Sequence, residues 1–314
     1  MSLSDHIQWQ NIPLPGLASE TNLTLAIGTV GQGEPIAVIS AGVHGDEGPW
    51  GAWAIHQMLE RIPLEKLNGT IRVVPVANPL AMQADLRNAP VDQLDLNRAF
   101  PGHPDGSYTE RVADLIVQNA LQDADYVIDL HGGGSWCVNA FVFEMENSEI
   151  LSNAIDAPFV VRAPDRSVTL TGYAKSKGAT VTAIEMGGRS QYEADWAHRI
   201  ATSLIRALKA VGVIEDSIDI EEKNGDAIPL GNSKVLRPKM GGIFMPIVKA
   251  DQVGKIVEEG TVLGHILDPV THQIKETFTA PFPQTAIMLL RPTLCRIEGG
   301  AMTYVLAAPL LTDN

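Results

Sequence analysis

Apolar runs separated by amphipathic stretches organise the first two-thirds of the chain. The runs have the length of single strands and occupy residues 23–30, 36–41, 71–76, 126–130, 139–144, 158–162 and 181–186. Apolar residues recur at helical spacing over 49–61, 107–121 and 193–211, and a shorter helix is expected over 146–154. Ser107, followed three residues later by Glu110, predicts a capping box at the second of these helices. Strands that alternate with helices predict an α/β protein whose sheet is flanked by helices.

Turn residues and loop lengths give three further expectations for the N-terminal part. Residues 1–20 contain proline and glycine breakers and are expected to form a loose arm. The turn residues between runs 23–30 and 36–41 predict that these two strands pair as a hairpin. The long stretch 77–96 is expected to be irregular, and loops of this length are usually functional.

The pattern changes near Gly212. Residues 216–226 are acidic and polar, which makes them a candidate boundary between domains. Short apolar runs broken by glycine and proline follow, and no helical period is evident among them. The sequence therefore predicts a catalytic α/β domain over residues 1–215 and a smaller, all-β domain over residues 216–314.

Composition narrows the class of partner. The chain has 314 residues, of which 45% are hydrophobic, and this is enough for a large core and two domains. The formal net charge of -14 argues against nucleic acid and against an anionic membrane surface as partners. The net charge does not exclude a small anionic substrate, because a local cluster of arginines can make the binding site positive. The expected partner is a small molecule, and the sequence leaves a homo-oligomer open.

Two further features concern the cellular compartment. No apolar stretch reaches the ~18–20 residues that span a bilayer, and residues 1–9 lack the basic and then apolar pattern of a secretory signal. Cys137 and Cys295 lie far apart in the sequence and are expected to be reduced thiols. A cytoplasmic protein is the resulting expectation.

Two of the apolar runs end in histidine. His44 follows run 36–41, with Glu47 three residues on, and His131 follows run 126–130. Ligand sites in open α/β sheets form at the carboxyl ends of strands, so these side chains are expected to converge. Two histidines and one glutamate are the ligand set of a catalytic zinc with a fourth position for water. The hypothesis is one Zn²⁺ per chain; the alternative is a chance set of surface residues.

A carboxylate ends a third apolar run. Glu185 is a lone acidic residue in the stretch 180–188, and a buried glutamate is costly unless it is paired or functional. Beside a metal-bound water it would be the general base; the alternative is a salt-bridged residue at a strand end. Asp129, two residues before His131, is a candidate acceptor for an imidazole N–H, or a residue that only shapes the floor of the site.

Four motifs in this order carry a family resemblance: His44-Gly45-Asp46-Glu47, Asp95-Leu96-Asn97-Arg98-Ala99-Phe100-Pro101-Gly102, Asp129-Leu130-His131-Gly132 and Ile184-Glu185-Met186-Gly187. Together they resemble the succinylglutamate desuccinylase/aspartoacylase family, relatives of the zinc carboxypeptidases, over roughly residues 20–310. The resemblance implies a zinc carboxypeptidase-like mixed sheet flanked by helices, with a smaller β-rich domain similar to a lipoyl-type barrel.

The resemblance also implies roles for residues of the Asn97 motif and of the loop before it. Arg87 would be a catalytic cation aimed at the oxygen that gains charge, unless it is a solvated loop residue. Asn97 and Arg98 would bind the substrate carboxylate beside the scissile amide, unless Arg98 only pins the turn 100–102. A second substrate carboxylate would need another cation, for which Arg162, Arg166 and Arg189 are candidates. Tyr173 and Tyr192 are candidates to close over the site.

The function that follows is a zinc-dependent amidohydrolase, a deacylase that cleaves the amide of an N-acyl amino acid or a similar small carboxylate-bearing amide. A zinc carboxypeptidase for short peptides is the alternative, since its chemistry is the same and only the depth of the pocket separates the two. A metal-binding protein without catalytic activity is a third reading, disfavoured by the presence of Glu185, Asn97 and Arg98.

Overall fold

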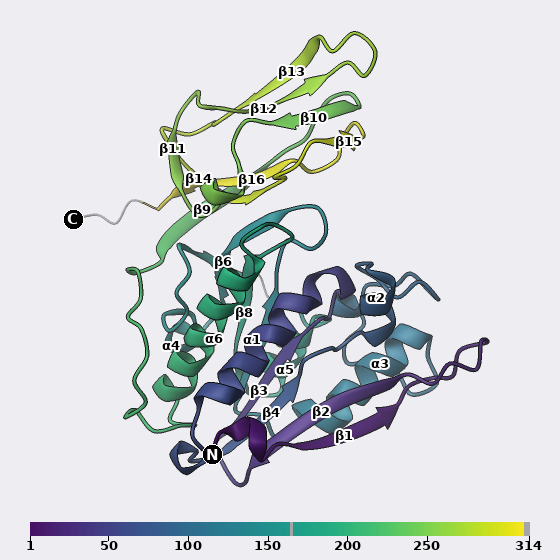
Figure 1. Cartoon of the computed structure of the whole chain (residues 1–314), viewed down its shortest axis with the longest axis vertical. Coiled ribbons are helices and arrows are strands. Elements are labelled where there is room, and N and C mark those ends of the chain that lie inside the picture. Colours follow the sequence, from purple (N-terminus) through teal and green to yellow (C-terminus); the bar gives the residue numbers. More distant parts are fainter. Residues whose placement is uncertain (164–165, 311–314) are drawn as a thin grey trace.

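A twelve-stranded mixed sheet runs through the molecule, and helices cover its N-terminal half (Figure 1). The computed structural model describes residues 1–163 and 166–310. In spatial order the strands are β1 (Gln8–Pro13), β2 (Thr24–Gly31), β4 (Thr70–Val74), β3 (Ile36–Ala41), β5 (Tyr126–His131), β8 (Thr180–Gly187), β6 (Val138–Glu144), β7 (Phe159–Arg162), β9 (Ile228–Leu236), β16 (Tyr304–Pro309), β14 (Gln284–Leu290) and β11 (Ile256–Glu258).

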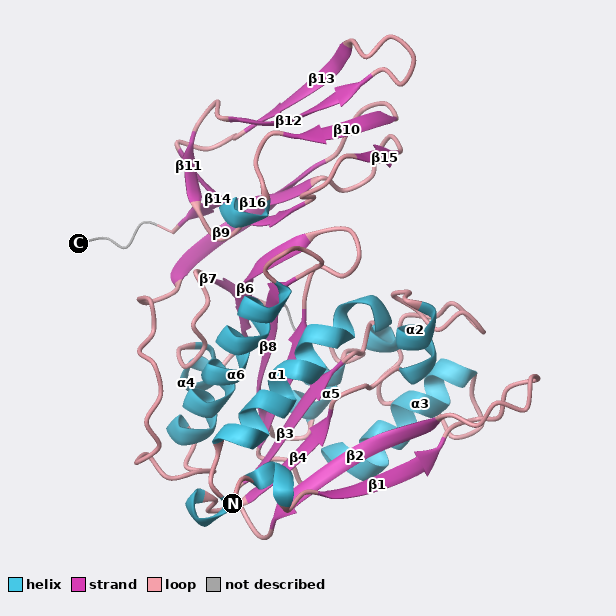
Figure 2. Ribbon diagram, in the orientation of Figure 1, coloured by secondary structure: helices cyan, strands magenta, loops and turns pink. Residues whose placement is uncertain are grey.

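Helices pack on both faces of the N-terminal half of this sheet (Figure 2). One hydrophobic cluster joins the sheet to α1 (Gly48–Arg61), α4 (Glu149–Ser152) and α6 (Glu193–Ala210). A second cluster joins the opposite face to α3 (Tyr108–Ile116), η5 (Val117–Leu121) and α5 (Leu170–Ser176). The predicted α/β layering is confirmed, and α3 begins with the predicted capping box at Ser107.

Four neighbouring strands at the centre of the sheet run parallel, in the order β4, β3, β5 and β8. Their carboxyl ends therefore meet at one edge. The register places His131 of β5 directly beside Glu185 of β8. Two short 3-10 helices reach the same edge, η2 (Gly45–Glu47) directly after β3 and η4 (Leu96–Arg98) in the chain that returns from β4.

Three expectations for the N-terminal part are wrong. Strands β2 and β3 do not form a hairpin, because β4 lies between them and pairs with both. Residues 1–20 are not a loose arm throughout: β1 adds to the sheet edge by antiparallel pairing with β2. The stretch 77–96 contains α2 (Pro79–Ala84), whose first turn is capped by the side chain of Asn78. Proline and glycine mark the ends of these elements, but pairing between segments distant in sequence decides which strands lie side by side.

The chain after residue 216 is built from strands. Four of them, β9, β11, β14 and β16, extend the main sheet, and β14 also pairs with β6. The other four form a second sheet in the order β13 (Ile274–Thr279), β12 (Val262–Leu267), β10 (Gly242–Pro246) and β15 (Cys295–Ile297). Among the residues described here, the 3-10 turn η6 (Ala250–Gln252) is the only helical segment. Buried rings of Phe244, Phe278 and Tyr304 pack between the two sheets.

The fold is therefore a mixed α/β structure with a second sheet near the C-terminus. The main sheet itself continues through β9 and β14 into the C-terminal part, so the division at residues 215/216 stays a prediction about independent units. Within the described ranges, no helix combines the length and the apolar character that crossing a membrane requires. Cys137 and Cys295 are both free thiols.

Candidate active site

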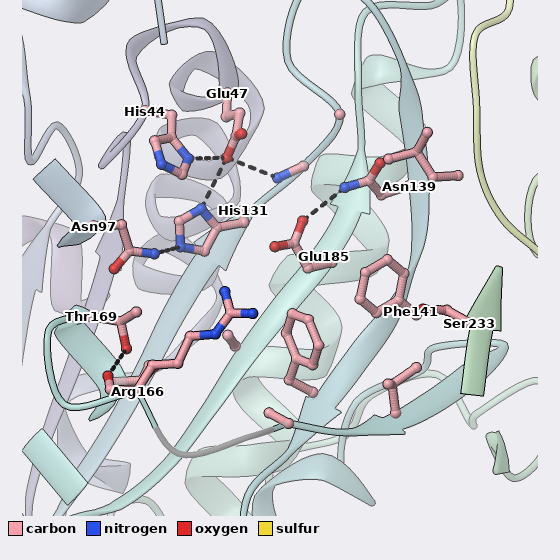
Figure 3. A pocket seen from close by; sticks show the side chains of 18 of the residues that line it. His44, Glu47, Asn97, His131, Asn139, Phe141, Arg166, Thr169, Glu185 and Ser233 are labelled. Carbon is pink, nitrogen blue, oxygen red and sulfur yellow. Dashed lines mark hydrogen bonds and ion pairs between the residues drawn. The ribbon is translucent and has the colours of Figure 1, made fainter. Parts of the chain in front are cut away.

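Three side chains from two neighbouring strand ends meet at one buried point. His44 and His131 each place Nδ1 at 2.9 Å from the same oxygen of Glu47, Oε2. Glu47 stands at the end of η2, and Figure 3 shows its carboxylate between the imidazoles of His44 and His131. The chain can turn this tightly because Gly45 packs against α2: a Cβ on Gly45 would lie 2.0 Å from the carbonyl carbon of Ala81.

Each imidazole is held from behind by a second carboxylate. His44 Nε2 lies 3.1 Å from Asp95 Oδ1, and His131 Nε2 lies 2.8 Å from Asp129 Oδ2. Asp129 in turn accepts a hydrogen bond of 2.6 Å from the hydroxyl of Ser40. The predicted role of Asp129 as a partner of an imidazole agrees with this contact. The equivalent role of Asp95 was missed, although Asp95 begins the second of the four motifs.

Burial and charge oppose each other in this cluster. Burial by itself would lower the pKa of both imidazoles, but the charge of Glu47 and the hydrogen bond to Asp95 raise the pKa of His44. Asp129 and Glu47 likewise raise the pKa of His131 well above its usual value. Burial would raise the pKa of Glu47, yet the two imidazoles hold it well below its usual range. The three groups thus bind one another through the atoms that a cation would take.

The donor set fits a metal ion. Ligand atoms of His44, Glu47 and His131 all lie within 4.8 Å of one another, and all three residues are buried. Two imidazole nitrogens and one carboxylate oxygen suit zinc and leave a coordination position open. The carboxylates behind the two rings are the outer partners that orient metal-binding histidines. The sequence-derived set of three therefore converges as a metal site requires.

Glu185 stands beside this cluster. Its Oε2 accepts a hydrogen bond of 2.8 Å from Asn139 Nδ2 on the neighbouring strand β6. Burial, reinforced by the charge of Glu47, raises the pKa of Glu185 to about 6, against the opposing charge of His131. The carboxylate is therefore ionised at neutral pH and becomes protonated in mildly acidic solution. A salt-bridged residue at a strand end would have a basic partner. The described contacts of Glu185 include no ion pair with a basic side chain.

Arg87 reaches the site from the loop after α2. Its guanidinium donates to Glu47 Oε1 and to Asp95 Oδ2, each at 3.1 Å, while 46% of the side chain stays exposed. The backbone of this loop is tied to η2, because Gly45 N–H donates to the carbonyl of Arg87. Two carboxylates therefore hold Arg87 although nearly half of its side chain is exposed, and its positive charge lies against the candidate metal-binding cluster.

Asn97 and Arg98 occupy η4 but differ in how they are held. Asn97 accepts a hydrogen bond from Leu170 N–H at 3.0 Å, and its Nδ2 lies 3.3 Å from His131 Nε2. Arg98 is exposed, and its one described hydrogen bond goes to the carbonyl of Asn97. Both residues line the same cavity as the metal-binding cluster. A substrate-binding role for them stays a prediction.

A cavity of about 590 Å³ opens over the cluster. Phe141, Phe143, Met145 and Val161 give it an apolar wall next to Glu185. Arg166 points from the far side into the cavity, toward His131 and Glu185 (Figure 3). The C-terminal part contributes Gly231, Asn232 and Ser233 of β9, Leu289 of β14 and Met302. This wall was not foreseen, because nothing in the local pattern of the C-terminal strands marks contact with a distant site.

Other sequence-derived candidates divide between the cavity and the surface. Arg162 lines the cavity, with Nε 3.9 Å from Glu144 Oε1. Arg189 instead forms an ion pair with Asp85 and does not line the cavity. The candidate tyrosines, Tyr173 and Tyr192, do not line the cavity either. Asn139 was missed, and the signal for it was a polar residue inside the otherwise apolar run 138–143.

Comparison with known proteins adds sequence relationships to this geometry. A family model described as succinylglutamate desuccinylase/aspartoacylase catalytic domain matches residues 34–211. A curated relative, the N-alpha-acetyl-L-2,4-diaminobutyric acid deacetylase of Halomonas elongata, is 40% identical over 111 residues. The match covers 35% of this chain and 32% of the relative, so the chain spans about a third of the length of that protein in the alignment.

Solved structures agree with the fold over nearly the whole chain. An aspartoacylase family protein from Mesorhizobium loti is 26% identical, with a TM-score of 0.78 and coverage of 98% of this chain and 96% of that one. A succinylglutamate desuccinylase/aspartoacylase from Rhodobacter sphaeroides has a TM-score of 0.81 at 24% identity, with coverage of 97% and 95%. The family model itself covers more than half of the chain and includes the metal-binding cluster and Glu185. The chain therefore belongs to the succinylglutamate desuccinylase/aspartoacylase family.

Proposed function

We propose that this protein is a zinc-dependent amidohydrolase that removes the acyl group from an N-acyl amino acid or a similar small amide that carries a carboxylate. The observation that carries the proposal is the convergence of His44, Glu47 and His131 beside Glu185 at the floor of one cavity. Metal storage would need the first three residues, but it would not need a carboxylate with a raised pKa beside them.

His44, Glu47 and His131 would hold one Zn²⁺. When bound, zinc supplies Lewis-acid chemistry, polarising oxygen atoms and lowering the pKa of a bound water toward ~7. Asp95 and Asp129 fix the orientation of the two imidazoles, so that both Nδ1 atoms face the same point. The ligand geometry is thus set by the protein before any ion binds.

Glu185 would act as the general base. With a pKa of about 6 it is a carboxylate at neutral pH, yet it is basic enough to take a proton from a water that attacks the amide carbon. The same carboxyl group would then deliver the proton to the departing amine. One oxygen of Glu185 is bound by Asn139, and the other lies on the His131 side of the cavity (Figure 3).

Arginines would bind the charges of the substrate. Arg87, held at 3.1 Å from Glu47, would supply a cation for the charge that develops on the attacked carbonyl oxygen. Arg98 offers a planar fork for the carboxylate next to the scissile amide. Arg166, which points into the far side of the cavity, would favour a second anionic group on the acyl or amino-acid part of the substrate.

The relatives support the reaction class. The name of the Halomonas elongata relative describes the removal of an acetyl group from an N-acetylated amino acid. The side chain of 2,4-diaminobutyric acid carries an amine, whereas Arg98, Arg162 and Arg166 line the cavity of this protein. This arrangement favours an anionic substrate here, so the reaction class is carried over and the particular substrate is not.

The alternative reading, a carboxypeptidase for short peptides, requires room for a peptide beyond the scissile bond. Strand β9, together with Leu289 and Met302, forms a wall on that cavity, which favours a small amide. The chain as a whole is negatively charged, whereas arginines line the cavity. This distribution of charge also favours a small-molecule partner over nucleic acid or an anionic membrane. A cytoplasmic location remains an expectation.

A hydrolysis screen tests the proposal. Purified protein is incubated with N-acetyl, N-succinyl and longer N-acyl derivatives of acidic, neutral and basic amino acids, and with dipeptides and tripeptides, before and after removal of metal by a chelator. We expect release of free amino acid from anionic N-acyl amino acids, loss of that activity after chelation, and its return with added zinc. Preferential hydrolysis of peptides would favour the carboxypeptidase, and metal binding without any hydrolysis would contradict both.

A further inference from the structure

Asn139 contacts the proposed base but has no role in the chemistry described so far. Asn139 is buried, with 5% of the residue exposed, and its Nδ2 donates to Glu185 Oε2 at 2.8 Å. Figure 3 shows the amide approaching Glu185 from the side opposite the imidazoles, so the second carboxylate oxygen is left toward the cavity. The contact therefore restrains one end of the carboxylate without occupying the end that faces the cavity.

The backbone of Asn139 is fixed from two sides. On one side β6 pairs with β8, where Asn139 lies opposite Gly187 and Phe141 lies opposite Glu185. On the other side β14 pairs with β6, and Leu289 lies opposite Asn139. Asn139 thus lies where a strand of the C-terminal part joins the main sheet, and its backbone is paired with a strand on each side.

A neighbouring thiol lies at the oxygen end of the Asn139 amide. Cys137 Sγ is within donor distance of two acceptors, the carbonyl of Gly133 at 2.9 Å and Asn139 Oδ1 at 3.6 Å. Burial raises the pKa of Cys137 well above its usual value, so the thiol keeps its single proton, and the two acceptors share it. With Oδ1 facing a donor, Nδ2 of Asn139 is the atom that faces Glu185.

We infer that Asn139 is the positioning residue for Glu185: its amide, oriented by the Cys137 thiol, holds one carboxylate oxygen so that the other faces the substrate. This inference rests on the proposed hydrolase function. A glutamate side chain has several rotamers, and selecting one of them costs conformational entropy. When a neighbour restrains the side chain in the folded protein, this cost is not added to the reaction step. Because a displacement of about 1 Å at a reacting group can cost ~100-fold in rate, a buried amide at this position affects turnover rather than binding.

Steady-state kinetics of variants tests the inference, starting from the wild type and from Glu185→Gln. Asn139→Ala removes the amide, and Asn139→Asp keeps its shape but replaces the donor by an oxygen. We expect kcat for an N-acyl amino acid to fall ~10- to 100-fold in both variants, with KM changed by less than about twofold. Zinc content and melting temperature should match those of the control Asn119→Ala, which loses a hydrogen bond of similar length, 2.8 Å, far from the cavity.

The thiol is tested by a matched pair. Cys137→Ser keeps a donor and should stay near the kcat of the wild type, whereas Cys137→Ala loses the donor and should show part of the Asn139→Ala effect. In the Glu185→Gln background, Asn139→Ala should cause no further loss of kcat, because nothing remains to be positioned. Equal extra loss in both backgrounds, or loss of zinc and of thermal stability in both Asn139 variants, would show that Asn139 is structural and would overturn the inference.

The outcomes separate the inference from the proposed function. If the wild type is active and Glu185→Gln is not, but Asn139→Ala keeps its kcat, the function stands and the inference fails. If the wild type hydrolyses no amide, the function fails, and crystal structures of the wild type and Asn139→Ala decide the inference. A Glu185 carboxylate that leaves its position in the variant supports positioning by Asn139; an unchanged carboxylate overturns it.

Discussion

The imidazole side of the cavity, formed by His44, Glu47 and His131, holds its charges very differently from the arginine side, formed by Arg98 and Arg166. Every polar group on the imidazole side is buried and has a partner at 2.8–3.1 Å. Arg98 and Arg166 are exposed, and among the described residues neither has an ion-pair partner; Arg98 donates only to the carbonyl of Asn97. Buried groups with saturated hydrogen bonds keep one geometry, whereas exposed arginines that have no ion pair with a described residue are available to a ligand.

This contrast separates the chemistry of the site from its selectivity. A buried charge that loses its partner pays the full cost of desolvation, so single changes on the imidazole side are expected to be severe. Substitution of an exposed arginine removes only its interaction with the ligand, so the loss of activity should depend on the substrate. The expected effects therefore decrease from the buried groups at the floor of the cavity, Glu185 among them, to the exposed arginines.

The largest effect is expected at the proposed base. Glu185→Gln keeps the shape and the contact with Asn139 but cannot accept a proton, so kcat should fall ~10²–10⁴-fold while zinc stays bound. The measurement is steady-state hydrolysis of an N-acyl amino acid together with metal analysis. Glu144→Gln, on the neighbouring strand β6, is the control and should remain active. Near-normal kcat in zinc-loaded Glu185→Gln would assign the proton to another group.

The next effect concerns the carboxylates behind the imidazoles. Asp129→Asn removes the charge that orients His131 through a contact of 2.8 Å, and loss of such an outer partner typically weakens metal binding 10- to 100-fold. Competition with a fluorescent zinc chelator measures the change in Kd. Asp125→Asn, one residue before the same strand, provides the control. Unchanged zinc affinity in Asp129→Asn would mean that packing alone orients the ring of His131.

The arginine side is tested by Arg98→Lys, which keeps the charge and loses the bidentate geometry. Turnover of an N-acyl amino acid should drop about tenfold or more, while an analogue with a neutral amide in place of the carboxylate should lose little. The two proteins and two substrates form a double-mutant cycle, in which we expect a coupling of ~1.5 kcal/mol or more. Equal losses for both substrates would make Arg98 structural and place the carboxylate elsewhere.

The smallest effect is the pH dependence of the wild type. Because burial raises the pKa of Glu185 to about 6, the base is ionised above that pH and protonated below it. Only the ionised form accepts a proton, so kcat/KM should fall as pH drops, by ~4-fold between pH 7.5 and 5.5. The profile is measured with zinc in excess. An acid limb centred near pH 4.5, the value for an exposed glutamate, would show that the site does not desolvate this carboxylate.

The sequence by itself determined the elements whose signal is local. Apolar runs and helical periods predicted β3, β5, β8, α1, α3 and α6, because burial of one face imposes a period on the chain. The same runs showed that His44, His131 and Glu185 follow or end strands, and parallel strands bring such ends to one edge. The metal-binding set could thus be chosen from residue type and position alone.

Only the tertiary structure decided what lies beside each element. That β4 separates β2 from β3, and that β14 and β9 reach the cavity, depends on pairings between strands distant in sequence, which leave no local signal. For the same reason Asp95 and Asn139 could not be assigned: a polar side chain in a sequence does not reveal which distant atom it will face. Local pattern fixes the direction of side chains along an element, and long-range packing chooses their partners.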